Sequence, residues 1–175
     1  MASTTLVLGG ARSGKSRFAL DVQSRRARVT FIATARADDA EMLERIERHR
    51  TERSDHWRTV EEPYELVARL REACAGTDAV IVDCLTVWVA NLMLRGDPDE
   101  HVLKQADELA ALLALHQADV TLVSNEVGLG VHPATADGRH FRDLLGHVNQ
   151  RVAAAADRVV LMVAGLPLTV KEARA

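Results

Sequence analysis

The sequence predicts an α/β protein with a mostly parallel sheet and helices on both faces. Short aliphatic runs alternate along the chain with longer segments of helical character. Each run is apolar throughout and does not alternate with polar residues, which is the pattern of strands buried on both faces. The length of 175 residues suits one domain with a single core, so we expect one domain over residues 1–175.

The elements follow from these runs and from their breaker residues. We expect five strands, at residues 4–8, 29–34, 78–83, 120–124 and 158–163. The helices are expected from residue 16 onward and at residues 38–53, 64–73, 84–94, 100–116 and 138–156. Pro63 suits the first turn of the helix that begins at residue 64. The helix over residues 84–94 is apolar nearly all round, so it is either fully buried or covered by another subunit.

Composition and charge exclude several classes of protein. Hydrophobic residues make up 47% of the chain, which predicts a folded protein. The formal net charge is −3 and no long basic run occurs, so binding to nucleic acid is not indicated. Cys74 and Cys84 lack metal-ligand spacing and are expected to be buried thiols in a reducing compartment. No apolar stretch approaches the roughly 18 residues of a membrane span, so we expect a cytoplasmic protein.

A glycine-rich stretch follows the first predicted strand and opens the first predicted helix. It fits the phosphate-loop pattern G-x-x-x-x-G-K-[ST] and consists of Gly9, Gly10, Ala11, Arg12, Ser13, Gly14, Lys15 and Ser16. In this context the backbone N–H groups and the positive end of the helix dipole can bind phosphates. Lys15 would then reach the β- and γ-phosphates, and the Ser16 hydroxyl would bind Mg²⁺. The alternative is an ordinary strand-to-helix turn with a solvated lysine.

Further candidates lie where other strands end, because ligands of such folds bind at the carboxyl ends of the strands. Asp83 closes an aliphatic strand and suits a Mg²⁺ site, although it could instead be a helix N-cap. Thr34 ends the second predicted strand. Glu126 could be a general base or a metal-linked acid, or only a loop carboxylate. Glu61 and Glu62 precede Pro63 and could cap the helix or bind a nucleotide hydroxyl.

His49 is a candidate nucleophile. On the predicted helix it shares a face with Arg53, and Arg45 lies one turn before it. Two guanidinium groups disfavour protonation of the imidazole, and a neutral imidazole is nucleophilic. The arginines would also neutralise phosphate oxygens during attack. The alternative is a surface histidine in a basic helix.

Several motifs in order resemble one known family. They are the glycine-rich stretch, Glu41-Met42 through Arg45-Ile46 to His49, Trp57-Arg58-Thr59 with Glu61, Ser124 to Gly130, Phe141-Arg142-Asp143, Gly146, Asn149-Gln150 and Ala156-Asp157. Together they resemble the bifunctional adenosylcobinamide kinase / adenosylcobinamide-phosphate guanylyltransferase family. The resemblance covers about residues 5–171, and the segments beyond the glycine loop separate this family from other P-loop kinases.

The resemblance implies a P-loop NTPase-like fold, ATP, GTP and Mg²⁺ as ligands, and two reactions. The first phosphorylates the hydroxyl of the aminopropanol arm of adenosylcobinamide. The second transfers GMP from GTP to that phosphate through a GMP-histidine intermediate, and His49 matches the guanylylated residue. We therefore expect Lys15 and His49 to be catalytic, and we expect Ser16 and Asp83 to bind the metal, as the P-loop pattern already indicated. The other implied nucleotide contacts are residues 9–16, Thr34, Ala35, Arg36, Arg50, Thr51, Glu52, Arg53, Glu61 and Asp83.

The chain departs from the family pattern at two places. Some members have a histidine where this chain has Arg48, and Val131-His132 replaces an expected aliphatic pair before Pro133. Similar proteins form trimers, so we expect a homo-oligomer, with residues 84–94 as a candidate contact. Two other functions remain open: a P-loop kinase for another small-molecule alcohol, and a GTP-dependent switch. The absence of an N-K-x-D-like guanine-reading element argues against the switch.

Overall fold

A computed structural model describes residues 2–36 and 56–172. Its strands are β1 (Thr4–Gly9), β2 (Val29–Ala33), β3 (Arg58–Glu61), β4 (Ala79–Asp83), β5 (Asp119–Val123), β6 (Arg158–Val163) and β7 (Leu166–Lys171). Its helices are α1 (Lys15–Gln23), α3 (Leu66–Cys74), α4 (Leu85–Arg95), α5 (Asp99–Leu113) and α6 (Ala136–Ala155). The helix expected over residues 38–53 lies outside the described residues.

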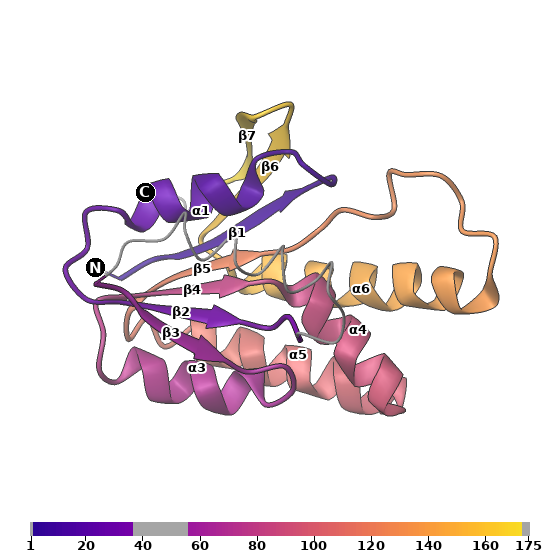
Figure 1. Cartoon of the computed structure of the whole chain (residues 1–175), viewed down its shortest axis with the longest axis horizontal. Helices are drawn as coiled ribbons and strands as arrows, with labels where there is room; N and C mark the ends of the chain where they lie inside the picture. Colours follow the sequence, from indigo (N-terminus) through magenta and orange to yellow (C-terminus); the bar gives the residue numbers. More distant parts are fainter. Residues whose placement is uncertain (1, 37–55, 173–175) are drawn as a thin grey trace.

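One sheet contains all seven strands, in the order β3-β2-β4-β5-β1-β6-β7. Every neighbouring pair is parallel except β6 and β7, which are antiparallel. This confirms the prediction of a mostly parallel sheet. Strand β1 lies inside the sheet between β5 and β6, so the segment that follows it begins near the middle of the carboxyl edge (Figure 1).

The expectation of five strands was wrong, because β3 and β7 were missed. Both are edge strands, and most of their residues are exposed. An edge strand need not carry the continuous aliphatic run by which the other strands were recognised. Pro167 in β7 is a further signal of an edge position, since proline cannot donate a hydrogen bond to a neighbouring strand.

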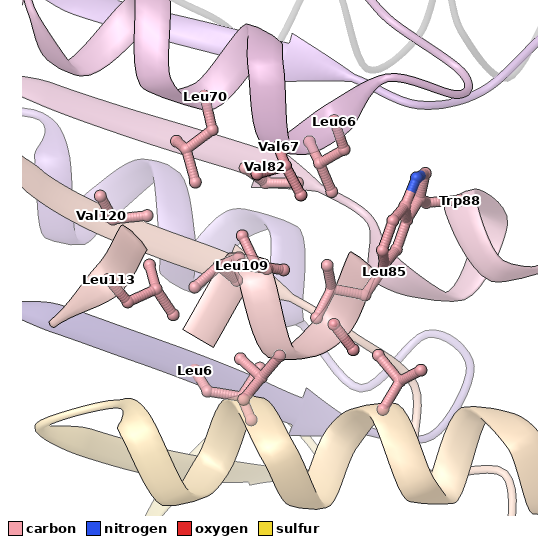
Figure 2. Packing of buried hydrophobic residues seen from close by; sticks show 14 of the residues in the cluster. Leu6, Leu66, Val67, Leu70, Val82, Leu85, Trp88, Leu109, Leu113 and Val120 are labelled. Atoms are coloured by element: carbon pink, nitrogen blue, oxygen red, sulfur yellow. The ribbon is translucent and has the colours of Figure 1, made fainter. Parts of the chain in front are cut away.

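Helices cover both faces of the sheet, as predicted. Helix α1 lies on one face, while α3, α5 and α6 lie on the other (Figure 1). The larger core is on the second face. Figure 2 shows its packing, with labels on Leu6, Leu66, Val67, Leu70, Val82, Leu85, Trp88, Leu109, Leu113 and Val120. The smaller core beneath α1 includes Ala19, Phe31, Ile81 and Val123. Alternate residues of β4 and β5 therefore point into different cores, as strand geometry requires.

Helix α4 is buried mainly within the chain. Leu85, Trp88, Val89 and Leu92 are all at most 1% exposed, and the Trp88 indole N–H donates to the Tyr64 carbonyl at 2.8 Å. Its apolar character is therefore explained by burial in the chain's own core. Leu94, at the end of the helix, is exposed.

The start of α3 differs from the prediction. Pro63 does not occupy its first turn, because the helix begins at Leu66 with Glu65 as N-cap. The Glu62 carboxylate accepts hydrogen bonds from the N–H groups of Tyr64 at 3.1 Å and Glu65 at 2.9 Å. These bonds hold residues 62–65 in a turn, and the helix begins only after it. Glu62 was considered as a cap of this helix, and its carboxylate does bind backbone N–H groups just before the helix begins.

Within residues 2–36 and 56–172, no helix is both long and apolar enough to cross a membrane.

Candidate nucleotide-binding site

The glycine loop connects β1 to α1 at the carboxyl edge of the sheet. Gly14 is the N-cap residue of α1, has φ +92° and supplies no side-chain cap. The first N–H groups of this nine-residue helix therefore have no side-chain acceptor from their N-cap residue. An anion at this position would gain both hydrogen bonds and a favourable interaction with the helix dipole.

Gly9 allows the loop to turn back over the sheet. Its φ is +151°, and a Cβ atom here would lie 2.6 Å from Ser13 Oγ and 2.7 Å from the Met162 carbonyl oxygen. Neither distance is compatible with a real side chain. Only glycine fits this close approach between the loop and β6.

The polar groups of the loop suit phosphate oxygens. Lys15 is 8% exposed, and its ammonium group donates to the Gly10 carbonyl at 2.5 Å. The amine thus lies over the loop, although it belongs to the first residue of α1. The buried hydroxyl of Ser13 has no hydrogen-bond partner in the part of the chain described. A cation and an unused hydroxyl on a turn of backbone N–H groups are donors that match a polyphosphate.

Residues of four neighbouring strands continue the site along the same edge. The register aligns Glu61 of β3 with Ala33 of β2, Ala33 with Asp83 of β4, and Asp83 with Val123 of β5. Val123 in turn pairs with Val7, two residues before Gly9. Asp83 is thus two strands from β1, about 10 Å across the sheet. The structure therefore places Glu61 and Asp83 in the same row across the sheet as Val7, two residues before the phosphate loop begins.

Thr34 joins the ends of β2 and β4. Its N–H donates to the Asp83 carbonyl at 3.1 Å. Its hydroxyl donates to the Cys84 carbonyl at 2.7 Å and accepts from the Cys84 N–H at 2.8 Å. The side chain is 0% exposed. Thr34 thus fixes Asp83 in place at the strand end.

Lys15 and Asp83 act on a common neighbour, the Cys84 thiol. Burial and the negative charge of Asp83 raise the pKa of Cys84 to about 12, while the positive charge of Lys15 opposes the rise. The thiol therefore stays protonated at neutral pH.

Arg36 lies beside an aromatic side chain at the same edge. Its guanidinium donates to the Tyr64 hydroxyl and lies 5.6 Å from the centre of the Tyr64 ring. Arg95 lies 4.7 Å from the same ring and forms ion pairs with Asp97 and Glu65. Arg36 follows Thr34 and Ala35, the residues with which it was predicted to contact nucleotide.

Two contacts to the loop were not foreseen from the sequence. The Glu126 N–H donates to the Gly9 carbonyl at 3.1 Å, and the Gly165 N–H donates to the Ser13 carbonyl at 3.1 Å. Gly165 belongs to the turn between β6 and β7, where Ala164 and Gly165 both have positive φ. Successive positive φ values are typical of two-residue hairpin turns. Gly165 is the sequence signal for this turn. It indicates a hairpin only if a strand is also expected after it, and β7 was not predicted.

The remaining predicted site residues are His49, Arg50, Thr51, Glu52 and Arg53, which lie outside the described residues. In the described ranges 2–36 and 56–172, no group of three or more His, Cys, Asp or Glu side chains could hold a metal ion. A Mg²⁺ ion in a P-loop protein needs fewer protein ligands, because nucleotide phosphates and water complete its shell. A hydroxyl at Ser16 and a carboxylate at Asp83 fit that donor set.

The fold and the glycine-loop motif together place the chain in the class of P-loop NTPase-like proteins. Two solved structures share this architecture. A KaiC-like protein from Pyrococcus horikoshii matches with a TM-score of 0.50 at 13% identity, over 91% of this chain and 70% of that one. The P4 protein of bacteriophage phi6, solved in complex with ADP, also has a TM-score of 0.50, at 17% identity over 95% of this chain and 54% of the other. These likenesses concern the fold alone.

Sequence comparison identifies the family to which the chain belongs. Residues 5–170 match the family model described as cobinamide kinase / cobinamide phosphate guanyltransferase, and the chain belongs to that family. It is 45% identical over 168 residues to the bifunctional adenosylcobalamin biosynthesis protein CobP of Pseudomonas aeruginosa, covering 95% of this chain and 96% of that protein. It is 43% identical to the corresponding CobU protein of Escherichia coli, covering 95% of this chain and 98% of that protein. The resemblance drawn from the motifs is thereby confirmed.

Proposed function

We propose that this chain phosphorylates adenosylcobinamide and then transfers GMP from GTP to the new phosphate, forming adenosylcobinamide-GDP in cobalamin biosynthesis. The observation that carries the proposal is the family match over residues 5–170, which includes the whole phosphate loop. The names of the relatives agree with it. The site supplies the chemical basis, because its loop has the donors that a nucleoside triphosphate requires.

Nucleotide binding is assigned to the carboxyl edge of the sheet. We assign the phosphates to residues 9–16 and the remaining nucleotide contacts to residues 34–36, residues 50–53 and Glu61. Ser16 and Asp83 would hold Mg²⁺, which supplies positive charge to the phosphate oxygens when it is bound. Asp83 suits this role because Thr34 fixes its backbone at the strand end.

The first reaction requires positioning and charge neutralisation more than covalent chemistry by the protein. The acceptor's hydroxyl oxygen attacks the γ-phosphorus of ATP or GTP, and the bond between that phosphorus and the bridging β-phosphate oxygen breaks. ADP or GDP leaves with the bonding electron pair, and the hydroxyl proton passes to solvent. Lys15 would stabilise the negative charge that develops on the phosphates, because its amine already lies over the loop at the Gly10 carbonyl. The buried position of Lys15 strengthens this interaction relative to that of a solvated lysine.

The second reaction requires a nucleophile. We propose that a nitrogen of His49 attacks the α-phosphorus of GTP and that pyrophosphate leaves. An oxygen of the phosphorylated acceptor then displaces the imidazole from the GMP phosphorus, which restores the histidine. The support for His49 is its sequence context beside Arg45 and Arg53. Division into two in-line steps avoids a direct displacement between two large anions.

GTP labelled at its α-phosphate tests this route. The protein is incubated with labelled GTP and Mg²⁺, denatured and separated from nucleotide. We expect retained label that is labile to acid, stable to base and absent from His49→Ala. His147→Ala is the matched control, since His147 is an exposed histidine of α6, and it should keep the label. Absence of label in the wild-type protein during turnover would refute the transferase half.

The same preparation separates the two alternatives. Phosphorylation of adenosylcobinamide without any label on the protein would indicate a kinase only. Phosphorylation of a different small alcohol in preference to adenosylcobinamide would indicate another kinase. Slow GTP hydrolysis without any acceptor would indicate a switch. In Lys15→Ala, phosphorylation should be abolished, and undiminished activity would contradict the assignment of the phosphate loop.

We also propose that the whole chain forms one domain, that it acts in the cytoplasm and that it assembles as a homo-oligomer, with a trimer as the expected form. Support for assembly comes from the β6–β7 hairpin, where Val163, Leu166, Leu168 and Val170 are each more than half exposed. This apolar surface is a better candidate contact than α4, which the chain itself buries. Sedimentation equilibrium gives the subunit number directly.

A further inference from the structure

A buried polar cluster behind the phosphate loop holds the segment that follows β5. Thr86 lies in the first turn of α4 and Asn149 lies in α6, and both side chains are more than nine-tenths buried. The Ser124 hydroxyl donates to Asn149 Oδ1 at 2.7 Å. Two helices that are far apart in sequence therefore meet at the end of one strand.

These side chains bind both backbone polar groups of Asn125, on the side of the segment that faces away from β1. Its N–H donates to Thr86 Oγ1 at 2.7 Å, and its carbonyl accepts from Asn149 Nδ2 at 3.1 Å. Elsewhere in β5 the neighbouring strands supply such partners, but β4 has already ended at Asp83 and the chain has turned into α4. The two side chains replace the missing strand. We refer to Thr86 and Asn149 as the strand-end clamp.

On its other side, the clamped segment contacts the beginning of the phosphate loop. The Ser124 N–H donates to the Val7 carbonyl at 2.9 Å and the Glu126 N–H donates to the Gly9 carbonyl at 3.1 Å. These two bonds extend the β5–β1 ladder beyond the last regular pair, up to the first glycine of the loop. The clamp therefore fixes both Gly9 and the backbone that carries Glu126.

We propose that Thr86 and Asn149 are positioning residues for phosphoryl transfer, acting through residues 124–126 on the phosphate loop. The inference rests on the proposed function, because the affected step is phosphorylation of adenosylcobinamide. Neither side chain needs to touch substrate. Displacement of the clamped segment would move the Glu126 carboxylate and the Gly9 carbonyl relative to the γ-phosphate, and misalignment of about 1 Å can cost up to about a hundredfold in rate.

The expected effect is on turnover more than on nucleotide affinity. The loop keeps a second anchor in the bond from Gly165 to Ser13, and Lys15 remains on α1. Nucleotide should therefore still bind when the clamp is broken, with a dissociation constant within about threefold of the wild type. The kcat of phosphorylation should fall about tenfold or more, as expected for misaligned reacting groups.

Thr86 offers the sharpest test. Thr86→Val keeps the shape of the side chain but removes the acceptor of the Asn125 N–H, whereas Thr86→Ser keeps the hydroxyl. Asn149→Ala breaks the other half of the clamp, and His147→Ala on α6 is the exposed control. For each variant, kcat is measured with adenosylcobinamide and divided by the number of nucleotide-binding sites from titration. This division removes the contribution of unfolded protein.

Three results are expected: a reduced kcat per site in Thr86→Val and Asn149→Ala, near-wild-type values in Thr86→Ser and His147→Ala, and a double variant less impaired than the product of the two single effects. Equal kcat per site in Thr86→Val and wild type would overturn the inference. So would equal loss in Thr86→Ser and Thr86→Val. A wild-type protein without activity on adenosylcobinamide would overturn the proposed function and this inference together.

Discussion

Replacement of Gly9 by alanine should impair nucleotide binding far more than the same replacement at Gly10. The two glycines are adjacent in the phosphate loop, so both variants add one methyl group at nearly the same place. At Gly10 a Cβ atom would meet nothing within 4 Å. At Gly9 it would meet Ser13 Oγ at 2.6 Å and the Met162 carbonyl oxygen at 2.7 Å.

The magnitude follows from the contact that cannot relax. The Ser13 hydroxyl could rotate away, but the Met162 carbonyl belongs to β6, which is paired with β1 and β7. The loop must therefore move. A non-glycine residue in the Gly9 conformation, with φ +151°, adds backbone strain of about 1–3 kcal/mol. If this strain weakens the binding free energy of GTP by about 2 kcal/mol, the dissociation constant rises about thirtyfold.

Isothermal titration with GTP and Mg²⁺ measures the affinity, and thermal unfolding of the same samples measures stability. We expect Gly9→Ala to bind at least about tenfold more weakly than Gly10→Ala and to have a lower Tm. A third variant, Gly9→Ala with Ser13→Ala, removes one of the two close contacts. It should recover only part of the loss in Tm, because the Met162 carbonyl contact remains. Its affinity for GTP is compared with that of Ser13→Ala alone, since the Ser13 hydroxyl is itself a proposed phosphate donor.

Equal affinity for GTP in Gly9→Ala and Gly10→Ala would refute the reasoning. It would mean that the loop can move away from β6 without loss of its phosphate-binding geometry. Full recovery of the Tm in the double variant would contradict the narrower claim that the backbone of β6 prevents the loop from relaxing.

Three further predictions concern the scaffold. Burial raises the pKa of Cys84 from 9.0 to about 12. The thiolate fraction at pH 8 is therefore about a thousandfold lower than in the unfolded chain. The rate at which iodoacetamide labels Cys84 should be lower in the native protein by a similar factor. Although burial opposes it, hydrogen bonds from Thr4 and His116 hold the pKa of Asp157 below its ordinary value. Asp157→Asn should therefore lower the free energy of unfolding by about 1–3 kcal/mol at pH 7, and the difference should narrow as acid protonates the native carboxylate, in urea titrations at several pH values. Trp88 is fully buried, so Trp88→Ala should cost about 3–5 kcal/mol in the same titrations, and a loss below about 1 kcal/mol would contradict its place in the core.

The sequence predicted the central part of the fold well for a physical reason. Strands β1, β2, β4, β5 and β6 are buried inside the sheet and therefore carry the aliphatic runs that identify them. Strands β3 and β7 lie at the edges, where exposure removes that signal. Hydrophobic patterning therefore reports burial, and it identifies a strand only where the strand is buried.

The residues of the candidate site also differ in whether a local sequence pattern indicates them. The positive φ of Gly9 and Gly14 fits the phosphate-loop pattern, which requires glycine at fixed spacing, while the binding role of these residues and of Lys15 stays a prediction. Thr86 and Asn149 could not be predicted as a pair, because they act through backbone groups 39 and 24 residues away. A side chain that replaces a missing strand has no local sequence pattern. Its role becomes visible only when the end of β5 is seen between α4 and α6.

The contacts of the phosphate loop explain how a short, glycine-rich segment keeps one conformation. Glycine gives freedom to the unfolded chain, so the loop would lose much entropy on becoming ordered. Its backbone is held at Gly9 by the segment after β5 and at Ser13 by the β6–β7 turn. Both anchors come from segments more than 100 residues further along the chain, and neither uses the N–H groups of α1. The loop is thus fixed through two of its carbonyl groups, and neither bond occupies an N–H group that the proposed function assigns to phosphate.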